Sequence, residues 1–442
     1  MIKTDVLILG GGLAGLSTAY HLNKISGLSA LIVEKEKYPG GTAASISKQG
    51  FTFDFTGHLL HLHDPYGKKL IQDLLKGNLR EINRSAWIYS HETLTRYPFQ
   101  ANTYGLPDSV INECLFGFLK TIHRPPSAKK KKTPTSFKDW AFETFGEGIC
   151  RHFLFPYNEK LWQRKLSTMT TEWQGRFVPA PKVSEVLYGA VMDQTKAFGY
   201  NASFLYPTKG GIQSLPNALS SRLKKKQLLL GHEALWIDLK TKEAFIKKIG
   251  LISFKRLVNT IPLNDFISLV KKTPARVLNA AEDLSSNSVY CLNLGVSGRV
   301  MPEKHWIYFP EKKYPFYRVG FYHQFASSNA PAGASSLYVE FSRNSKSKVR
   351  LSDMESLALK ALKDCKILKP DNQILIKEWL PIKCGYVVYD FKRTKVLNAL
   401  LPYLAQNGVE SIGRYGAWKY SFMEEAIMDG KKCAEKLKGN LC

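Results

Sequence analysis

Apolar runs and glycine-rich turns alternate through the first fifty residues of the chain. One apolar run leads into Gly10, Gly12 and Gly15, and the next apolar run ends at an acidic residue, Glu34. In a strand, turn and helix with this spacing, the first glycine permits the tight turn, the second lets the backbone approach a pyrophosphate, and the third lets the helix pack on the strand. An acid at the end of the second strand can bind an adenosine ribose hydroxyl. The pattern therefore predicts a dinucleotide-binding βαβ unit, with phosphates at the helix N-terminus.

The apolar periodicity changes further along the chain. An aromatic-rich section from about residue 100 to 200 follows a mostly helical period, whereas residues 285–345 and 374–390 contain period-two segments typical of an antiparallel sheet. A glycine turn, a helix and short strands return between residues 205 and 270, and another glycine turn with an amphipathic helix follows residue 413. We predict an α/β fold with a discontinuous Rossmann-like domain over residues 1–95, 205–270 and 385–442, a mainly helical domain over 96–204, and an antiparallel β-sheet domain over 271–384.

Composition limits the class of protein. A chain of 442 residues with 44% hydrophobic content can bury a sizeable core. It contains no apolar run of eighteen or more residues, so we expect a soluble, cytoplasmic protein. The seven cysteines are odd in number and scattered, with no CxxC pair. Neither a disulfide framework nor a zinc site is therefore expected, and we predict no metal.

The charge balance is strongly basic. Lys and Arg number 63 against 37 Asp and Glu, a formal net charge of +26, which attracts polyanions. These cations are spread along the chain and no nucleic-acid recognition module accompanies them, so we expect no specific nucleic-acid partner. A solvated surface is the main interpretation, and peripheral association with an anionic membrane stays open beside it.

A second glycine turn indicates which dinucleotide binds. Gly40 and Gly41 follow Glu34 within seven residues. A further turn so close to the ribose-binding acid suits a long cofactor with two phosphates to cover, which favours FAD over NAD. This extension resembles the large family of FAD proteins that includes amine oxidases, protoporphyrinogen oxidase and UDP-galactopyranose mutase.

Further motifs resemble those of the UDP-galactopyranose mutases, most of all the eukaryotic-type enzymes, along nearly the whole chain. Gly175 and Tyr200 depart from the family pattern, which has glutamate and proline there. The matching motifs are FTGHLLH (55–61), RYPFQ (96–100), PYNEKLW (156–162), WQGRF (173–177), GYNASF (199–204), PFYR (315–318), GYVVY (385–389) and GRYGAWKY (413–420).

The resemblance implies a role for individual residues. The implied cofactor-binding residues are Gly10, Gly12, Gly15, Glu34, Gly41, Gly57, His58, Arg414 and Met423. The implied substrate-binding residues are Tyr97, Gln100, Trp162, Arg176, Asn201, Arg318, Tyr386 and Tyr420, and His58, Arg176 and Arg318 are the implied catalytic residues. Arginines are planar, permanently charged donors suited to phosphate oxygens, and phenols add neutral donors.

The resemblance also implies a reaction. The mutases are intramolecular transferases that interconvert the pyranose and furanose forms of a nucleotide sugar, UDP-galactose by default, by attack of reduced flavin N5 on the anomeric carbon. NADPH or NADH would reduce the flavin, and Arg84 and Arg414 match positions that contact NADPH. Such an enzyme would serve glycan or cell-wall biosynthesis. The chain has no convincing Ser-His-Asp or Cys-His signature, which agrees with a nucleophile supplied by the cofactor.

Two other classes of function stay open. The first is an FAD-dependent oxidoreductase of the amine oxidase or protoporphyrinogen oxidase type, which needs a stoichiometric electron acceptor. The second is a basic binding protein that keeps FAD as a structural group and whose affinity for polyanions falls with salt. The sequence leaves the sugar, the nucleotide, the reductant and the oligomeric state undetermined.

Overall fold

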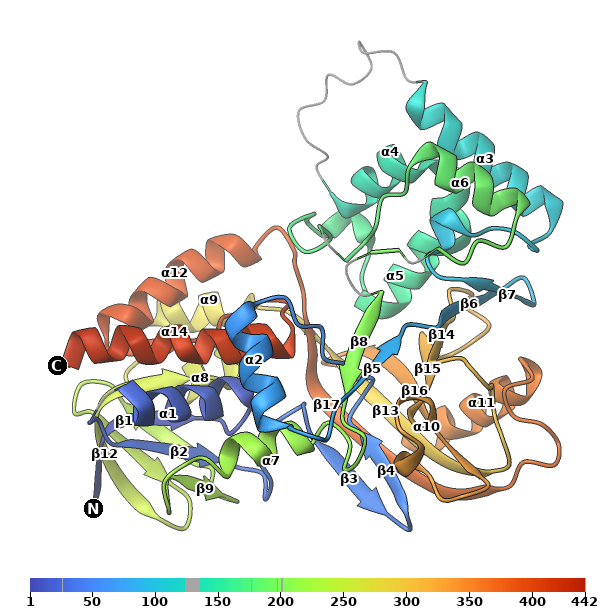
Figure 1. Ribbon diagram of the computed structural model, residues 1–442. Helices are drawn as coiled ribbons and strands as arrows, with labels where there is room; N and C mark the ends of the chain where they lie inside the picture. Colours follow the sequence, from blue (N-terminus) through green and yellow to red (C-terminus); the bar gives the residue numbers. More distant parts are fainter. Residues whose placement is uncertain (26, 124–135, 176, 197, 200–201, 442) are drawn as a thin grey trace.

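The computed structural model describes residues 1–25, 27–123, 136–175, 177–196, 198–199 and 202–441. Two seven-stranded sheets organise the chain, one carrying helices on its faces and the other lying below a group of helices (Figure 1). The predicted α/β fold, with a Rossmann-like domain, a helical region and an antiparallel sheet, is confirmed. None of the described helices is both long and apolar enough to cross a bilayer.

The first sheet joins three separated stretches of the chain. β1 pairs in parallel with β2 on one side and with β12 on the other, and β2 together with the last residues of β1 and β12 is buried on both faces. β18 and β9 extend the parallel part, and β10 and β11 form an antiparallel edge. The strands are β1 (Ile2–Leu9), β2 (Ala30–Glu34), β9 (Leu228–Leu230), β10 (Ala234–Asp238), β11 (Glu243–Ile246), β12 (Gly250–Asn259) and β18 (Val409–Ser411).

Helices α1 (Leu13–Ile25) and α14 (Met423–Leu441) lie against each other over this sheet (Figure 1). Their approach is close at Gly430, where a Cβ atom would lie 2.6 Å from the carbonyl oxygen of Ala14. The packing brings the start of α14 beside the glycine turn that precedes α1. Four further helices of this half are α2 (Pro65–Leu74), α7 (Ser214–Ser220), α8 (Leu263–Leu269) and α9 (Ala275–Glu282).

The second sheet has the strand order β17-β13-β16-β15-β14-β6-β7. All neighbours are antiparallel except β14 and β6, so the antiparallel sheet predicted for residues 285–345 and 374–390 is confirmed. β6 and β7 belong to this sheet, whereas the predicted boundary assigns residues up to 95 to the cofactor domain. The strands are β6 (Ala86–Ser90), β7 (Thr93–Arg96), β13 (Ser286–Ser297), β14 (Trp306–Tyr308), β15 (Arg318–Phe321), β16 (Ala334–Asn344) and β17 (Ile374–Val387).

The mainly helical region predicted from about residue 100 is present above this sheet (Figure 1). Its helices are α3 (Asp108–Ile122), α4 (Phe137–Ile149), α5 (Phe155–Trp162) and α6 (Val183–Val191). α3 and α4 approach closely because Gly148 faces α3, where a Cβ atom would lie 2.2 Å from the carbonyl oxygen of Glu113. The remaining described elements include β3 (Ser45–Lys48), β4 (Phe51–Asp54), β5 (Arg80–Asn83), β8 (Ser203–Tyr206), α10 (Tyr322–Phe325), α11 (Leu351–Asp364), α12 (Arg393–Gln406) and α13 (Gly413–Gly416).

One partly buried lysine, Lys160, fastens the helical region to the second sheet. Lys160 Nζ donates to the carbonyl oxygens of Phe309, Glu311 and Tyr314 at 2.6–2.9 Å and approaches that of Phe316 at 3.2 Å. This loop leads directly into β15 and therefore into Arg318.

Replacing Lys160 with Met should destabilise the protein by about 3 kcal/mol, because several buried carbonyl groups lose their donor together. Urea unfolding followed by far-UV circular dichroism measures the change. Lys165→Met is the matched control, since Lys165 is exposed. Equal unfolding midpoints for the two variants would contradict the anchoring role.

Candidate functional site

A cavity of about 980 Å³ extends from the carboxyl end of β1 to the helical region. Most of the sequence-predicted site residues line it, although they come from widely separated segments. Gly15 and Trp162 do not line it, and Arg176 and Asn201 lie outside the described residues. The predicted residues that do line it are Gly10, Gly12, Glu34, Gly41, Gly57, His58, Tyr97, Gln100, Arg318, Tyr386, Arg414, Tyr420 and Met423.

The two glycine turns lie side by side at one end of this cavity. Gly40 N–H donates to the carbonyl of Gly11 at 2.8 Å, and the backbones of Gly12 and Gly40 form a parallel bridge. Gly10 has φ of +102°, which a residue with a side chain rarely adopts. A Cβ atom on Gly15 would lie only 2.0 Å from the carbonyl oxygen of Gly10. Gly15 therefore acts by letting α1 approach the turn and not by facing the cavity.

Glu34 is fixed beside these two glycine turns, and we call the turns and Glu34 together the dinucleotide cradle. Its Oε2 accepts from Gly11 N–H at 2.6 Å and its Oε1 accepts from Glu36 N–H at 2.8 Å. Burial raises the pKa of Glu34, while these two amide donors oppose that rise. The carboxylate lies on the cavity wall beside the paired glycine turns, and its predicted contact with a ribose stays a prediction. The described residues thus fit FAD.

His58 lies on the cavity wall and is neutral at neutral pH. Burial, together with the nearby cations Arg414 and Arg318, lowers its pKa to about 4. Its Nδ1 lies 3.1 Å from Thr56 Oγ1. A neutral imidazole can form a hydrogen bond to a cofactor or a sugar without adding a charge.

Arg318 has a carboxylate partner that the motifs did not indicate. Its Nε and Nη2 donate to Glu340 at 2.6 and 2.8 Å in a two-pronged contact, and Glu340 is fully buried. Although burial acts to lower the pKa of Arg318, the carboxylate raises it well above its ordinary value. The sequence did hold a signal for this partner, because Glu340 is the charged residue within the buried apolar run from Leu337 to Phe341.

Arg414 presents a different electrostatic environment. Its Nη atoms donate to the carbonyl oxygens of Ser421 and Gly385 at 3.1 and 3.2 Å, and its buried Nε has no partner among the described residues. Its guanidinium carbon lies 4.7 Å from the ring centroid of Tyr420. Among the described residues Arg414 contacts neutral groups and has no carboxylate partner, whereas Arg318 is paired with Glu340.

Aromatic rings form the wall between the two arginines. Tyr386 and Tyr420 stack with centroids 5.8 Å apart, and Phe177 meets Tyr420 edge-on at 4.4 Å. Trp162 supports Tyr386 from behind at 5.7 Å. Trp162 is 1% exposed, so it packs behind the wall and does not present its ring to the cavity. Its predicted contact with substrate thus becomes support of Tyr386.

Three buried histidines should make the fold sensitive to acid. Burial lowers the pKa of His58, His61 and His305 to about 4. The unfolded chain protonates histidine near pH 6.5, so the folded state should lose stability as the pH falls from about 6.5 towards 4. The expected loss is about 3 kcal/mol per histidine at most.

Calorimetric unfolding between pH 7.5 and 4.5 measures this loss. His305→Gln retains a side-chain acceptor for Ser85 N–H, which donates to His305 Nδ1 at 2.8 Å, and lies away from the cavity. The variant should show a shallower fall in unfolding temperature with acid. An unchanged slope would contradict the assignment of part of the acid sensitivity to His305.

Comparison with known proteins supports a flavin site. Residues 8–76 match the model of a family described as an NAD(P)-binding Rossmann-like domain. A probable flavin-containing monoamine oxidase A from Dictyostelium discoideum is 36% identical over 70 residues, which is 16% of this chain and 15% of that protein's length.

Two solved structures resemble the whole chain. A reduced UDP-galactopyranose mutase matches with a TM-score of 0.93 and 26% identity over 99% of this chain and 96% of its own. The cyclohexylamine oxidase of Brevibacterium oxydans matches with a TM-score of 0.69 and 14% identity over 99% of both chains, a likeness of fold alone. The similarity extends over both sheets and the helices, and it supports FAD as the cofactor.

Proposed function

This chain belongs to the UDP-galactopyranose mutase family of flavoproteins, and from that premise we propose that it is a flavin-dependent, redox-neutral isomerase. Its substrate would be a nucleotide sugar, UDP-galactose by default, with pyranose and furanose forms interconverted. The observation that carries the proposal is the joining of the dinucleotide cradle to a cavity walled by Arg318, Arg414, Tyr386 and Tyr420. An amine oxidase fold alone does not require these donors.

Different residues along this cavity would bind the cofactor and the substrate. The glycine turns, Glu34 and the start of α14 at Met423 would hold FAD, which when bound and reduced supplies a nucleophilic N5 for the anomeric carbon. Arg318, Tyr386 and Tyr420 would hold the departing diphosphate through charged and neutral donors. The family resemblance assigns Arg176 and Asn201 to the same pocket.

Two further properties of the wall suit this chemistry. Neutral His58 would bind near the flavin without competing with the arginines for the diphosphate. The rings of Tyr97, Tyr157 and Tyr308 narrow the cavity and would exclude water from the reacting sugar. Gln100 would orient the nucleotide or sugar from the same side. NADPH or NADH would serve as the reductant, with Arg84 and Arg414 as the candidate contacts.

The alternative is a true oxidoreductase of the amine oxidase type, which the fold of the cyclohexylamine oxidase favours. An amine substrate is a cation at neutral pH, and Arg414 would repel it because no carboxylate in the described part of the chain contacts this guanidinium. A stoichiometric electron acceptor is the property that separates the two classes.

The deciding experiment incubates the purified, dithionite-reduced holoprotein with UDP-galactofuranose and follows UDP-galactopyranose by chromatography. Oxidised protein is the control. Conversion by the reduced protein alone, without net consumption of reductant, supports the mutase. If the yellow protein converts nothing in either state, a panel of other nucleotide sugars and then amine-dependent oxygen consumption would identify which alternative replaces it.

The basic surface suggests a cellular setting for this activity. We propose peripheral association with an anionic membrane in the cytoplasm, where a nucleotide-sugar enzyme would supply glycan assembly. Sedimentation with phosphatidylserine vesicles at rising salt tests it, and no binding at low salt would overturn it.

A further inference from the structure

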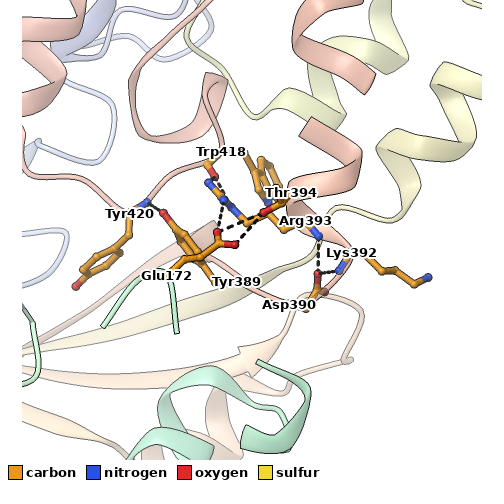
Figure 2. Close-up of polar contacts among 8 residues, drawn as sticks. All are labelled: Glu172, Tyr389, Asp390, Lys392, Arg393, Thr394, Trp418 and Tyr420. Atoms are coloured by element: carbon orange, nitrogen blue, oxygen red, sulfur yellow. Dashed lines mark hydrogen bonds and ion pairs between the residues drawn. The ribbon is translucent and has the colours of Figure 1, made fainter. Parts of the chain in front are cut away.

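The start of α12 meets two segments that carry residues of the cavity wall (Figure 2). Arg393 is the first residue of α12, and Asp390 Oδ1 accepts from its backbone N–H at 3.0 Å. This contact fixes the beginning of the helix. The guanidinium of Arg393 is therefore attached to a rigid element of the fold.

The guanidinium holds the loop that contains Tyr420. Its Nε and Nη2 both donate to the carbonyl oxygen of Trp418, at 3.0 and 2.6 Å. Trp418 is fully buried and has φ of +50°, an unusual conformation for a bulky residue, which persists only where its surroundings impose it. The two N–H donors of Arg393, which lies at the start of α12, impose such a constraint on Trp418.

A second contact fixes the same loop two residues later. Tyr389 Oη accepts from Tyr420 N–H at 2.8 Å, and the guanidinium carbon of Arg393 lies 3.9 Å from the centroid of the Tyr389 ring. Arg393 thus supports Tyr389 by stacking while it binds Trp418 directly. The backbone is held at both Trp418 and Tyr420, as Figure 2 shows.

The second segment comes from the helical region. Glu172 Oε2 lies 3.3 Å from Arg393 Nη1, and Glu172 Oε1 accepts from Thr394 Oγ1 at 3.0 Å. Glu172 immediately precedes Trp173, which lines the cavity. The side chain of Arg393 is 11% exposed, so this network is largely shielded from water on the Arg393 side.

We propose that Arg393, which does not itself line the cavity, is a positioning residue for the diphosphate-binding wall. It holds the Trp418–Tyr420 backbone and the Trp173 segment in fixed positions relative to each other. It thereby places the Tyr420 phenol beside Tyr386 and Arg414. The inference deepens the proposed function and rests on it. Arg393 would thus contribute to substrate binding indirectly, through its contacts with Tyr389 and Trp418.

The test compares Arg393→Met, which removes the charge and the paired Nε and Nη2 donors, with Arg393→Lys, which keeps the charge. Arg276→Met on α9 is the matched control, since Arg276 is exposed. Hydrogen exchange of the peptides that cover residues 413–422, measured on the FAD-bound protein by mass spectrometry, should be at least about tenfold faster in Arg393→Met than in the control. Arg393→Lys should fall between them.

Binding of UDP to the same FAD-bound proteins supplies the functional measurement. The Kd should rise about tenfold in Arg393→Met, and KM for UDP-galactofuranose should rise more than kcat falls, with FAD content unchanged. If Arg393 acts through Tyr420, the loss of UDP binding in Arg393→Met with Tyr420→Phe should be smaller than the sum of the two single losses.

Four results would decide against the inference or separate it from the proposed function. Unchanged exchange in Arg393→Met, or full additivity with Tyr420→Phe, would overturn it. Faster exchange with an unaltered Kd for UDP would also overturn it, because the held segment would then not serve binding. No UDP binding by the unmodified protein would count against the proposed function, and exchange would still decide whether Arg393 holds the loop.

Discussion

Arg318→Met should lower kcat/KM for the nucleotide sugar by about a thousandfold, since a charged donor to a diphosphate contributes several kcal/mol when it is shielded from water. Arg318 is the predicted catalytic arginine that the structure describes, and it lies on the cavity wall beside Tyr386 and Tyr420. The assay is mutase turnover by the dithionite-reduced protein, with Arg276→Met as the exposed-arginine control.

The same substitution should also destabilise the fold, by about 3–5 kcal/mol, because it leaves the carboxylate of Glu340 buried without its partner. This gives a way to separate binding from stability. In Arg318→Met combined with Glu340→Gln, urea unfolding should return towards that of the unmodified protein, because an amide is less costly to bury than an unpaired charge. Turnover should stay low.

Recovery of turnover in the double variant would mean that Arg318 serves only to neutralise Glu340. Turnover that stays low while stability returns would place Arg318 among the groups that bind substrate. The pair of measurements is needed because either loss alone could follow from unfolding.

Gly15→Ala should abolish FAD retention and weaken the fold, whereas Gly12→Ala should affect FAD retention alone. A Cβ atom on Gly15 would lie 2.0 Å from the Gly10 carbonyl oxygen and 3.2 Å from Ile8 Cγ2, so α1 must move away from the turn. Overpacking of this kind costs about 2–3 kcal/mol. On Gly12 the nearest atom outside its immediate neighbours would be the Gly40 oxygen, 4.0 Å away. That methyl group would meet only the cofactor.

The ratio of flavin to protein absorbance after purification, together with the unfolding temperature, measures both effects. Gly27→Ala is the matched control, because Gly27 follows α1, is exposed, and has nothing within 4 Å of an added Cβ atom. Normal FAD content in Gly12→Ala would contradict close approach of a pyrophosphate at that residue. Normal stability in Gly15→Ala would contradict the packing role assigned to Gly15.

The chain resembles both amine oxidases and a mutase, and the two ends of the cavity explain why both resemblances can hold. The cradle formed by the glycine turns and Glu34 is what a dinucleotide requires, whatever reaction follows. The opposite wall, with its arginines and phenols, is where a reaction class would be selected. Predictions about Arg318 and Arg393 therefore test function, whereas those about Gly12 and Gly15 test cofactor binding.

Several features of this protein follow from the amino-acid sequence by itself. The βαβ unit was predictable because its glycines and Glu34 act within a single turn and two adjacent strands, so that their spacing is a local property. The helical and antiparallel regions were predictable from side-chain period for the same reason. Most of the site residues that the short motifs indicated line the cavity, including His58, Tyr386 and Tyr420.

Other features depend on contacts between residues far apart in the sequence, which local periodicity does not specify. β6 joins the second sheet because it pairs with β14, more than two hundred residues later, and Trp162 supports the wall from behind because α5 ends against Tyr386. Glu340 reaches Arg318 only across the β15 and β16 pairing. Arg393 meets Glu172 and Trp418 only after the helical region and the last loop have folded against α12. The sequence by itself therefore determined the cofactor cradle and the types of element, whereas tertiary structure decided which charges are paired and which side chains hold the substrate wall in place.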